Sequence, residues 1–158
     1  MEILWTPWRY SYIVGEERPP GCIFCGLPEQ GDDRETLILH RGSLNYVIMN
    51  LFPYSNGHLM VVPFVHEPDL KTLDDDATAE MMKLAKRVQA VLESEYNPDG
   101  FNIGWNLGKC AGAGVAGHVH LHIVPRWSGD AGFMTVIGET RIVPEDLMST
   151  YDRLKKHF

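Results

Sequence analysis

The chain has little positive charge and no long apolar run. Its 158 residues include 14 Lys and Arg against 21 Asp and Glu, a formal net charge of −7. A nucleic-acid-binding surface or a polybasic membrane anchor needs clustered positive charge, so we expect neither nucleic acid nor a membrane as a partner. No apolar run approaches the roughly 20 residues that a membrane span requires. A small anionic ligand is compatible with this balance, because it needs only a few local donors.

Cysteine is also scarce, and the three residues present cannot all pair within the chain. Cys22 and Cys25 are separated by two residues, a spacing that suits a metal or redox site better than a structural disulfide. We expect no role for Cys110. The first residues lack a basic flank followed by an apolar core, so we expect no secretory signal and a cytoplasmic protein.

Composition and hydrophobic periodicity predict one domain over residues 1–158, with an irregular aromatic and proline-rich arm at 1–21. An amphipathic helix of about four to five turns is expected, with Asp74–Asp76 at its start, an apolar pattern from Met81 to Leu92, and Asn97–Gly100 at its end. A short helix is expected over Glu145–His157. Short connections favour antiparallel strands. The fold class is therefore α+β, a five-stranded antiparallel sheet with one long helix and a C-terminal helix. The strands are expected at Thr36–His40, Leu44–Met49, His58–Val62, Phe101–Trp105 and from His118 to a stop at Pro125.

The strongest chemical feature is the segment His118-Val119-His120-Leu121-His122. Side chains alternate between the faces of a strand, so the three histidines share one face and the apolar residues the other. Three adjacent imidazoles cannot form ordinary core, because each needs polar partners when buried. The residues alone leave three interpretations: a catalytic face, a metal-binding triad, or partly exposed histidines on an edge strand.

A glycine-rich stretch leads directly into this segment. Glycine lets backbone N–H groups approach a phosphate closely, and such a stretch before the histidines predicts an anion cradle. The glycines are Gly104, Gly108, Gly112, Gly114 and Gly117.

Together these residues resemble the histidine triad (HIT) superfamily, whose signature is His-x-His-x-His with apolar residues between. The run from Asn50 to Pro63 is similar to the second motif of that family, and the resemblance covers roughly Cys22 to Trp127. The segments Leu4–Arg9, Cys22–Cys25 and Pro125–Asp130 are most similar to the branch that contains bacterial diadenosine tetraphosphate phosphorylases. The resemblance implies a homodimer that binds an adenine nucleotide or a dinucleoside polyphosphate.

The resemblance also implies roles for individual residues. His120 attacks the α-phosphorus and forms a nucleotidyl-histidine, while His122 donates to the phosphoryl oxygens, with His118 the first member of the triad. A neutral imidazole is a competent nucleophile when an acceptor holds its other nitrogen. His58 lies near the phosphates, or is simply a histidine packed at the start of a strand. Asn50 binds ribose hydroxyls, or is a turn residue ahead of Pro53.

Phosphate-binding residues are expected at Gly112, Ala113 and Gly114. Many HIT proteins have a Gly-Gln pair where this chain has Ala113-Gly114, and small side chains there leave room for inorganic phosphate as a second substrate. Trp127 either stacks on a base or packs in the core. Lys109 either meets the outer phosphates or is a solvated surface residue.

The spacing of Cys22 and Cys25 supplies two thiolates for zinc. The resemblance adds His66 and His118, which would complete a closed and therefore structural zinc site. The alternative is a pair of reduced or redox-active cysteines without metal.

The leading functional hypothesis is nucleotidyl transfer or hydrolysis at the α-phosphate of dinucleoside polyphosphates, with phosphate or water as the acceptor. Three alternatives remain at this point. The chain could be a nucleoside phosphoramidate hydrolase, or a metallohydrolase in which the three triad histidines bind a catalytic metal. It could also be a nucleotide-binding module without activity.

Overall fold

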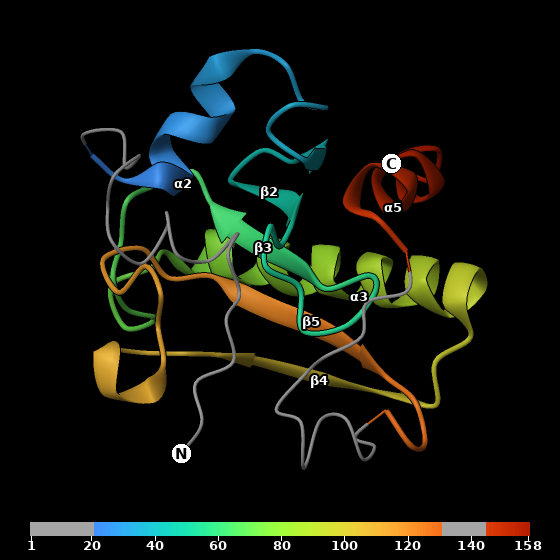
Figure 1. The fold of residues 1–158 in the computed structure, drawn as a ribbon. Coiled ribbons are helices and arrows are strands. Elements are labelled where there is room, and N and C mark those ends of the chain that lie inside the picture. The colour runs from blue at the N-terminus through green and yellow to red at the C-terminus, as the bar shows by residue number, and fades with distance from the viewer. Residues whose placement is uncertain (1–20, 131–144) are drawn as a thin grey trace, which may run out of the picture.

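A five-stranded antiparallel sheet organises the computed structural model, which describes residues 21–130 and 145–158. The strand order is β1-β2-β3-β5-β4, so the last strand in sequence inserts between β3 and β4 (Figure 1). This confirms the predicted α+β class. The arm predicted at 1–21 lies, except for Gly21, outside the described residues. The strands are β1 (Ile38–Arg41), β2 (Asn45–Met49), β3 (Leu59–Pro63), β4 (Gly100–Trp105) and β5 (Leu121–Arg126).

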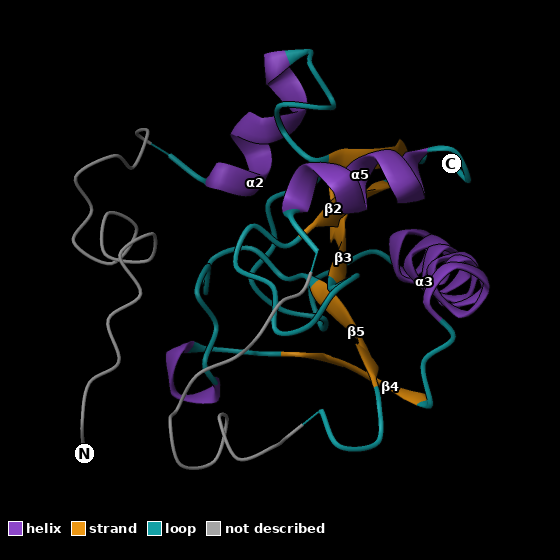
Figure 2. Ribbon diagram, turned by 45° about the vertical axis from the view of Figure 1, so that its right-hand side comes forward, coloured by secondary structure: helices purple, strands orange, loops and turns teal. Residues whose placement is uncertain are grey.

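The long helix α3 (Asp75–Tyr96) covers one side of the sheet and contacts β2, β3 and β5. The side chain of Asp74 caps its first turn by accepting from the N–H of Asp76 at 2.8 Å, and Asn97 ends it in the left-handed conformation. It begins beside Asp74 and ends at Asn97, as predicted, and its 22 residues make about six turns rather than the four to five expected. Figure 2 shows α3 on one side of the sheet and α2 (Ile23–Gly26) on the other. None of the helices in the described residues has the length and apolarity needed to cross a bilayer.

The strand that carries the histidines differs from the prediction at both ends. Its ladder begins at Leu121 rather than His118, because the N–H of Val119 donates to the carbonyl of Glu67 at 2.6 Å instead of joining a neighbouring strand. Pro125 does not stop the strand, which continues to Arg126. Pairing with β3 ends at Ile123, so no strand on that side requires the missing N–H of the proline.

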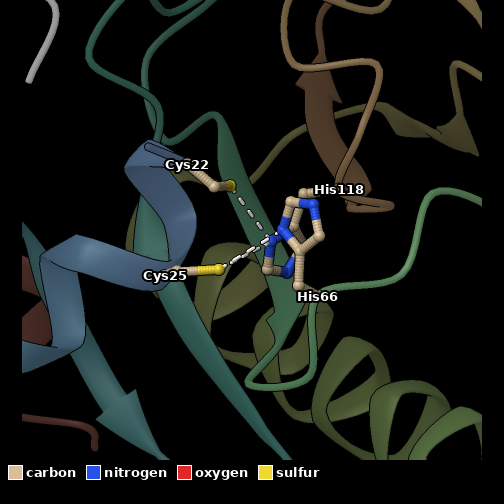
Figure 3. A group of neighbouring side chains, drawn as sticks. All are labelled: Cys22, Cys25, His66 and His118. Carbon is tan, nitrogen blue, oxygen red and sulfur yellow. Dashed lines mark hydrogen bonds between the residues drawn. The ribbon is translucent and has the colours of Figure 1, made fainter. Parts of the chain in front are cut away.

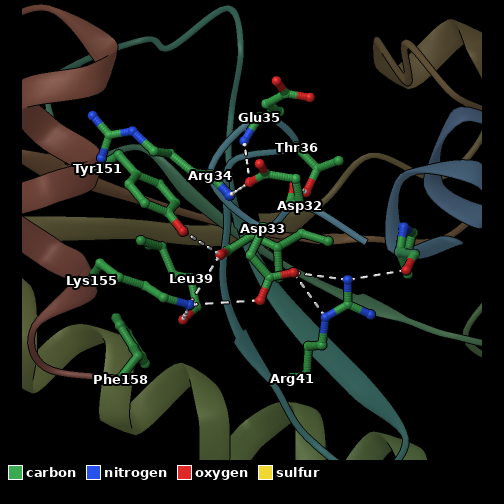
Figure 4. A network of polar contacts seen from close by, with 12 residues as sticks. Asp32, Asp33, Arg34, Glu35, Thr36, Leu39, Arg41, Tyr151, Lys155 and Phe158 are labelled. Atoms are coloured by element: carbon green, nitrogen blue, oxygen red, sulfur yellow. Dashed lines mark hydrogen bonds and ion pairs between the residues drawn. The ribbon is translucent and has the colours of Figure 1, made fainter. Parts of the chain in front are cut away.

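The C-terminal helix α5 (Leu147–Lys155) packs on β1 and α3. It is shorter than predicted, because the side chain of Asp146 caps it by accepting from two backbone N–H groups at 3.0 Å. Figure 4 shows how Asp33 ties this helix to the sheet. Its carboxylate accepts from Nε of Arg41 at 2.9 Å and lies 3.7 Å from Nζ of Lys155.

The sheet register places residues of two neighbouring strands beside His122 of β5. Met60 of β3 and Gly104 of β4 both lie opposite His122 of β5 in the sheet register. A Cβ atom added to Gly104 would meet nothing within 4 Å, so β4 leaves open space beside His122. The remaining helical segments among the described residues are the 3-10 turns η1 (Leu27–Gln30) and η2 (Lys109–Ala111).

Candidate functional site

The side chain of His120 is held in one tautomer. It is only 5% exposed, and its Nδ1 lies 2.8 Å from the backbone carbonyl of His118. A carbonyl can only accept, so Nδ1 carries the proton and Nε2 keeps its lone pair. Burial lowers the pKa of His120, and the hydrogen bond to the carbonyl offsets only part of this effect. His120 is therefore neutral near pH 7, with a nucleophilic nitrogen at Nε2.

His122 is held in the opposite tautomer by a short chain of hydrogen bonds. The backbone N–H of Tyr54 donates to Nδ1 of His58 at 3.1 Å, so Nε2 of His58 must carry the proton. That Nε2 lies 3.0 Å from Nδ1 of His122 and donates to it. Nε2 of His122 therefore carries a proton that it can donate. Burial, followed by the neighbouring His120, lowers the pKa of His122 to about 4.

Asn50 lies beside His58, as the sequence predicted for two residues at one site. Its Nδ2 is 3.3 Å from Nδ1 of His58, while its Oδ1 accepts from the N–H of Phe52 at 2.9 Å. The second bond matches the turn role weighed for this residue. Asn50 thus contributes to the His58 environment and to the turn after β2.

Two aromatic residues that the sequence reasoning did not single out line the histidines. The ring of Phe24 lies 4.8 Å from that of His120 and 5.6 Å from that of His118. The ring of Tyr54 lies 4.5 Å from that of His58. The sequence did offer a signal for each of them. Phe24 lies between the predicted ligands Cys22 and Cys25, and Tyr54 lies between the predicted site residues Asn50 and His58.

A second cluster adjoins the first through His118. Nδ1 of His118 lies 3.3 Å from Sγ of Cys22 and 3.6 Å from Sγ of Cys25, and Nδ1 of His66 lies 3.4 Å from Sγ of Cys25. All four ligand atoms lie within 4.8 Å of one another. Figure 3 shows the two sulfur atoms pointing from the α2 turn toward the two imidazoles.

The donor atoms of this cluster fit zinc. Bonds of about 2.3 Å to sulfur and about 2.0 Å to nitrogen put a tetrahedral sulfur and nitrogen pair about 3.5 Å apart, close to the three sulfur–nitrogen distances of 3.3, 3.4 and 3.6 Å. Nε2 of His118 donates to the carbonyl of Pro63 at 2.9 Å, which leaves Nδ1 free to bind a metal and fixes the ring orientation. Burial raises the pKa of the Cys25 thiol, with a further contribution from Cys22. A bound cation would reverse that shift by stabilising the thiolates.

The triad as a whole is not arranged around a metal. Among the residues that the structure describes, the only group placed to hold an ion is that of Cys22, Cys25, His66 and His118. His118 belongs to that group, whereas His120 and His122 do not. This arrangement weakens the hypothesis of a catalytic metal bound by all three triad histidines.

Two amides of the predicted anion cradle are used within the loop itself. The N–H of Gly112 donates to the carbonyl of Lys109 at 3.0 Å, and that of Ala113 donates to the carbonyl of Gly108 at 3.3 Å. These bonds close the η2 turn on itself. Lys109 and Cys110 are exposed on it, and Gly114 follows directly.

Trp127 lies apart from the histidines. It follows the far end of β5, about 16 Å along the strand from His122. Its Nε1 donates to the backbone carbonyl of Tyr96 at 3.4 Å, at the end of α3. The structure therefore favours the packing role that was weighed for this residue over stacking on a base.

Comparison with known proteins finds the model of the HIT domain family matching residues 33–129. The chain is 39% identical over 158 residues to an AP-4-A phosphorylase of Mycobacterium tuberculosis, with 95% of this chain and 80% of that protein covered. It is 34% identical over 93 residues to a bis(5'-adenosyl)-triphosphatase of Dictyostelium discoideum, with 59% of this chain and 62% of that protein covered. Its fold is similar to that of a Zn-bound histidine triad family protein from Mycobacterium smegmatis. That structure has a TM-score of 0.69 and 27% identity, with 87% of this chain and 92% of the other covered.

Proposed function

This chain belongs to the HIT domain family, and from that premise we propose that it cleaves dinucleoside polyphosphates by nucleotidyl transfer to His120. One observation carries the proposal. The rings of His120 and His122 lie 4.7 Å apart in opposite tautomers, one presenting a lone pair and the other a proton. A nucleophile beside a donor is what phosphoryl transfer requires, because negative charge on the phosphoryl oxygens must be stabilised as the bond forms.

In the first step, Nε2 of His120 attacks the α-phosphorus of the dinucleotide. A bond forms between nitrogen and phosphorus, and the bond from phosphorus to the bridging oxygen breaks, releasing the rest of the polyphosphate. Nε2–H of His122 donates to the phosphoryl oxygens during this step. Asn50 and His58 hold His122 and the turn beside it. The product on the protein is a nucleotidyl-histidine.

In the second step, an acceptor oxygen attacks the same phosphorus and His120 leaves as a neutral imidazole. Water as acceptor gives AMP and ATP from diadenosine tetraphosphate, whereas inorganic phosphate gives ADP and ATP. We favour phosphate, because Ala113 and Gly114 are small and the M. tuberculosis relative is a phosphorylase. The D. discoideum relative, a triphosphatase, supports the broader class of dinucleoside polyphosphate substrates.

A structural zinc ion held by Cys22, Cys25, His66 and His118 is part of the proposal. When bound, zinc with four protein ligands supplies a cross-link rather than a catalytic water. The cross-link would join the α2 turn to the segment that precedes β5. In this arrangement the side chain of His118 would bind zinc, while its backbone carbonyl accepts from Nδ1 of His120.

We also propose a homodimer in the cytoplasm. β4 ends the strand order of the sheet, and Ile103 on it is 45% exposed, so an antiparallel β4 of a second copy could continue the sheet. The three cysteines are unpaired thiols, as in a reducing compartment. Light scattering of the purified protein gives the oligomeric state directly, and a monomeric mass would contradict the dimer.

The test of the proposed activity is incubation with diadenosine tetraphosphate, with and without inorganic phosphate, followed by chromatography of the nucleotides. ADP and ATP formed only with phosphate would establish phosphorolysis, and AMP and ATP would establish hydrolysis. His120→Ala should abolish both, whereas His40→Ala on β1 should keep wild-type activity. Turnover that survives in His120→Ala would refute the mechanism. Cleavage of a nucleoside phosphoramidate but of no dinucleotide would favour that alternative substrate class.

A further inference from the structure

Phe24 is the residue that joins the cysteine cluster to the triad. It lies between Cys22 and Cys25 in the single helical turn α2, and its side chain is only 6% exposed. Its ring lies 4.8 Å from that of His120, tilted by 51°, and 5.6 Å from that of His118, nearly edge-on at 72°. The same turn therefore presents two sulfur atoms to His118 and one ring to His120.

The backbone of Phe24 is fixed as firmly as its ring. Its carbonyl accepts a hydrogen bond of 2.7 Å from the hydroxyl of Tyr46, a residue of β2 with no exposed surface. The turn is closed by the carbonyl of Cys22, which accepts from the N–H groups of Cys25 and Gly26, both at 3.1 Å. These bonds hold the backbone of Phe24 in place, and burial of its side chain restricts the ring beside His120.

We propose that Phe24 is a positioning residue for His120, and this inference rests on the proposed role of His120 as the nucleophile. The hydrogen bond from Nδ1 to the carbonyl of His118 fixes the tautomer of His120 but allows the imidazole to rock about that bond. Contact with Phe24 limits this rocking and keeps water from one face of the ring. Nε2 is then aimed at one point, as a nucleophile in a near-attack geometry must be.

The Cys22–Cys25 turn thus positions the ring of Phe24 in addition to offering two ligands for a metal. Zinc bound at the four proposed ligands would hold the turn in place, and the turn positions the ring of Phe24 against His120. The backbone carbonyl of His118, whose side chain is itself a zinc ligand in the proposal, reaches His120 by a second path. Loss of the ring alone should therefore affect the nucleophile while the metal site remains intact.

The experiment compares Phe24→Leu and Phe24→Met with Phe101→Leu in the otherwise complete protein. Both Phe24 variants keep an apolar side chain without the ring, and methionine fills irregular space readily, so the fold should be retained. Phe101 on β4 is a partly buried phenylalanine that packs against the same core, so it controls for the general loss of a ring. Zinc content, kcat and KM for diadenosine tetraphosphate, and the ¹⁵N resonances of His120 are measured for each.

We expect both Phe24 variants to retain zinc and a KM within about twofold of the wild type, while kcat falls about tenfold because the nucleophile is less well aimed. The well-separated ¹⁵N resonances of the two His120 nitrogens should move toward each other as the ring samples other orientations. Phe101→Leu should change neither kcat nor the His120 resonances. A purely structural role would not move the His120 resonances.

Three results would overturn the inference. The first is a wild-type kcat with unchanged His120 resonances in the Phe24 variants. The second is a loss of kcat in Phe101→Leu equal to that in the Phe24 variants. The third is a raised KM at constant kcat in the Phe24 variants, which would place Phe24 against the nucleotide instead. If the wild-type protein cleaves no dinucleotide, the proposed function fails. The His120 resonances would then still decide whether Phe24 orients that ring, so the two failures can be told apart.

Discussion

Nε2 of His58 donates to Nδ1 of His122 across 3.0 Å, joining two residues that are 64 positions apart in the sequence. The direction of this bond follows from its neighbour, because the N–H of Tyr54 already occupies Nδ1 of His58. His58 therefore determines which nitrogen of His122 carries the proton. It acts through His122 rather than by touching the reacting phosphorus in the proposed mechanism.

Replacing His58 should test this relationship. His58→Leu removes the donor to His122, so both tautomers of His122 become populated and we expect kcat to fall about a hundredfold with a smaller change in KM. His58→Gln should retain more activity than His58→Leu, since its amide can still donate. Steady-state kinetics with diadenosine tetraphosphate would measure kcat and KM for both variants. Equal activity in His58→Leu and the wild type would contradict the assignment.

The depressed pKa of His122 predicts a loss of stability in mild acid. Burial and the nearby His120 lower the pKa to about 4 in the folded protein, against about 6.5 in the unfolded chain. Between these values the unfolded state binds more protons, so the free energy of unfolding should decrease as the pH falls from about 6.5 toward about 4. Urea unfolding of the wild type and His122→Gln over this range measures the effect. The variant should show the shallower dependence, and identical slopes would exclude this contribution.

The elements of the fold could be predicted because their signals are local. Alternation and short connections located all five strands, and the apolar pattern located α3. The misplaced boundaries depend on contacts that no local pattern contains. Pro125 remains in β5 because β3 has already ended beside it, and the N–H of Val119 leaves the ladder for the carbonyl of Glu67.

The sequence identified the histidines and cysteines that the structure brings together, but it did not predict the hydrogen bonds between them. Nothing in the spacing of His58 and His122 indicates which one donates, because the answer lies with the backbone N–H of Tyr54. Phe24 reads in the sequence as an ordinary apolar residue. Its importance appears only when the turn around it folds against His118 and His120.

Zinc should contribute to stability through the cluster around His118. Cys25→Ser removes one of four proposed ligands, so we expect the purified variant to contain little zinc. A loss of about 3 kcal/mol of linked binding energy corresponds to a Tm lower by about 10 °C for a domain of this size. Metal analysis and thermal unfolding measure the two effects. Cys110→Ser is the matched control, because Cys110 is exposed and outside the cluster, and it should leave both values unchanged. Similar behaviour of the two variants would contradict the site.

Glu80 on α3 should stabilise the turn between β1 and β2. Its carboxylate accepts from the backbone N–H groups of Ser43, Leu44 and Asn45, each at 2.8 Å. Burial opposes its ionisation, but the bonds from the Asn45 side chain and these N–H groups outweigh burial and lower the pKa of Glu80. Glu80→Gln should therefore cost about 1 to 3 kcal/mol near pH 7. The stabilisation from ionised Glu80 is present above the unfolded pKa of about 4.3 and is lost as the pH falls through the lower folded value. The difference between the wild type and Glu80→Gln in urea unfolding should thus shrink in acid, whereas the exposed control Glu35→Gln should differ little at any pH.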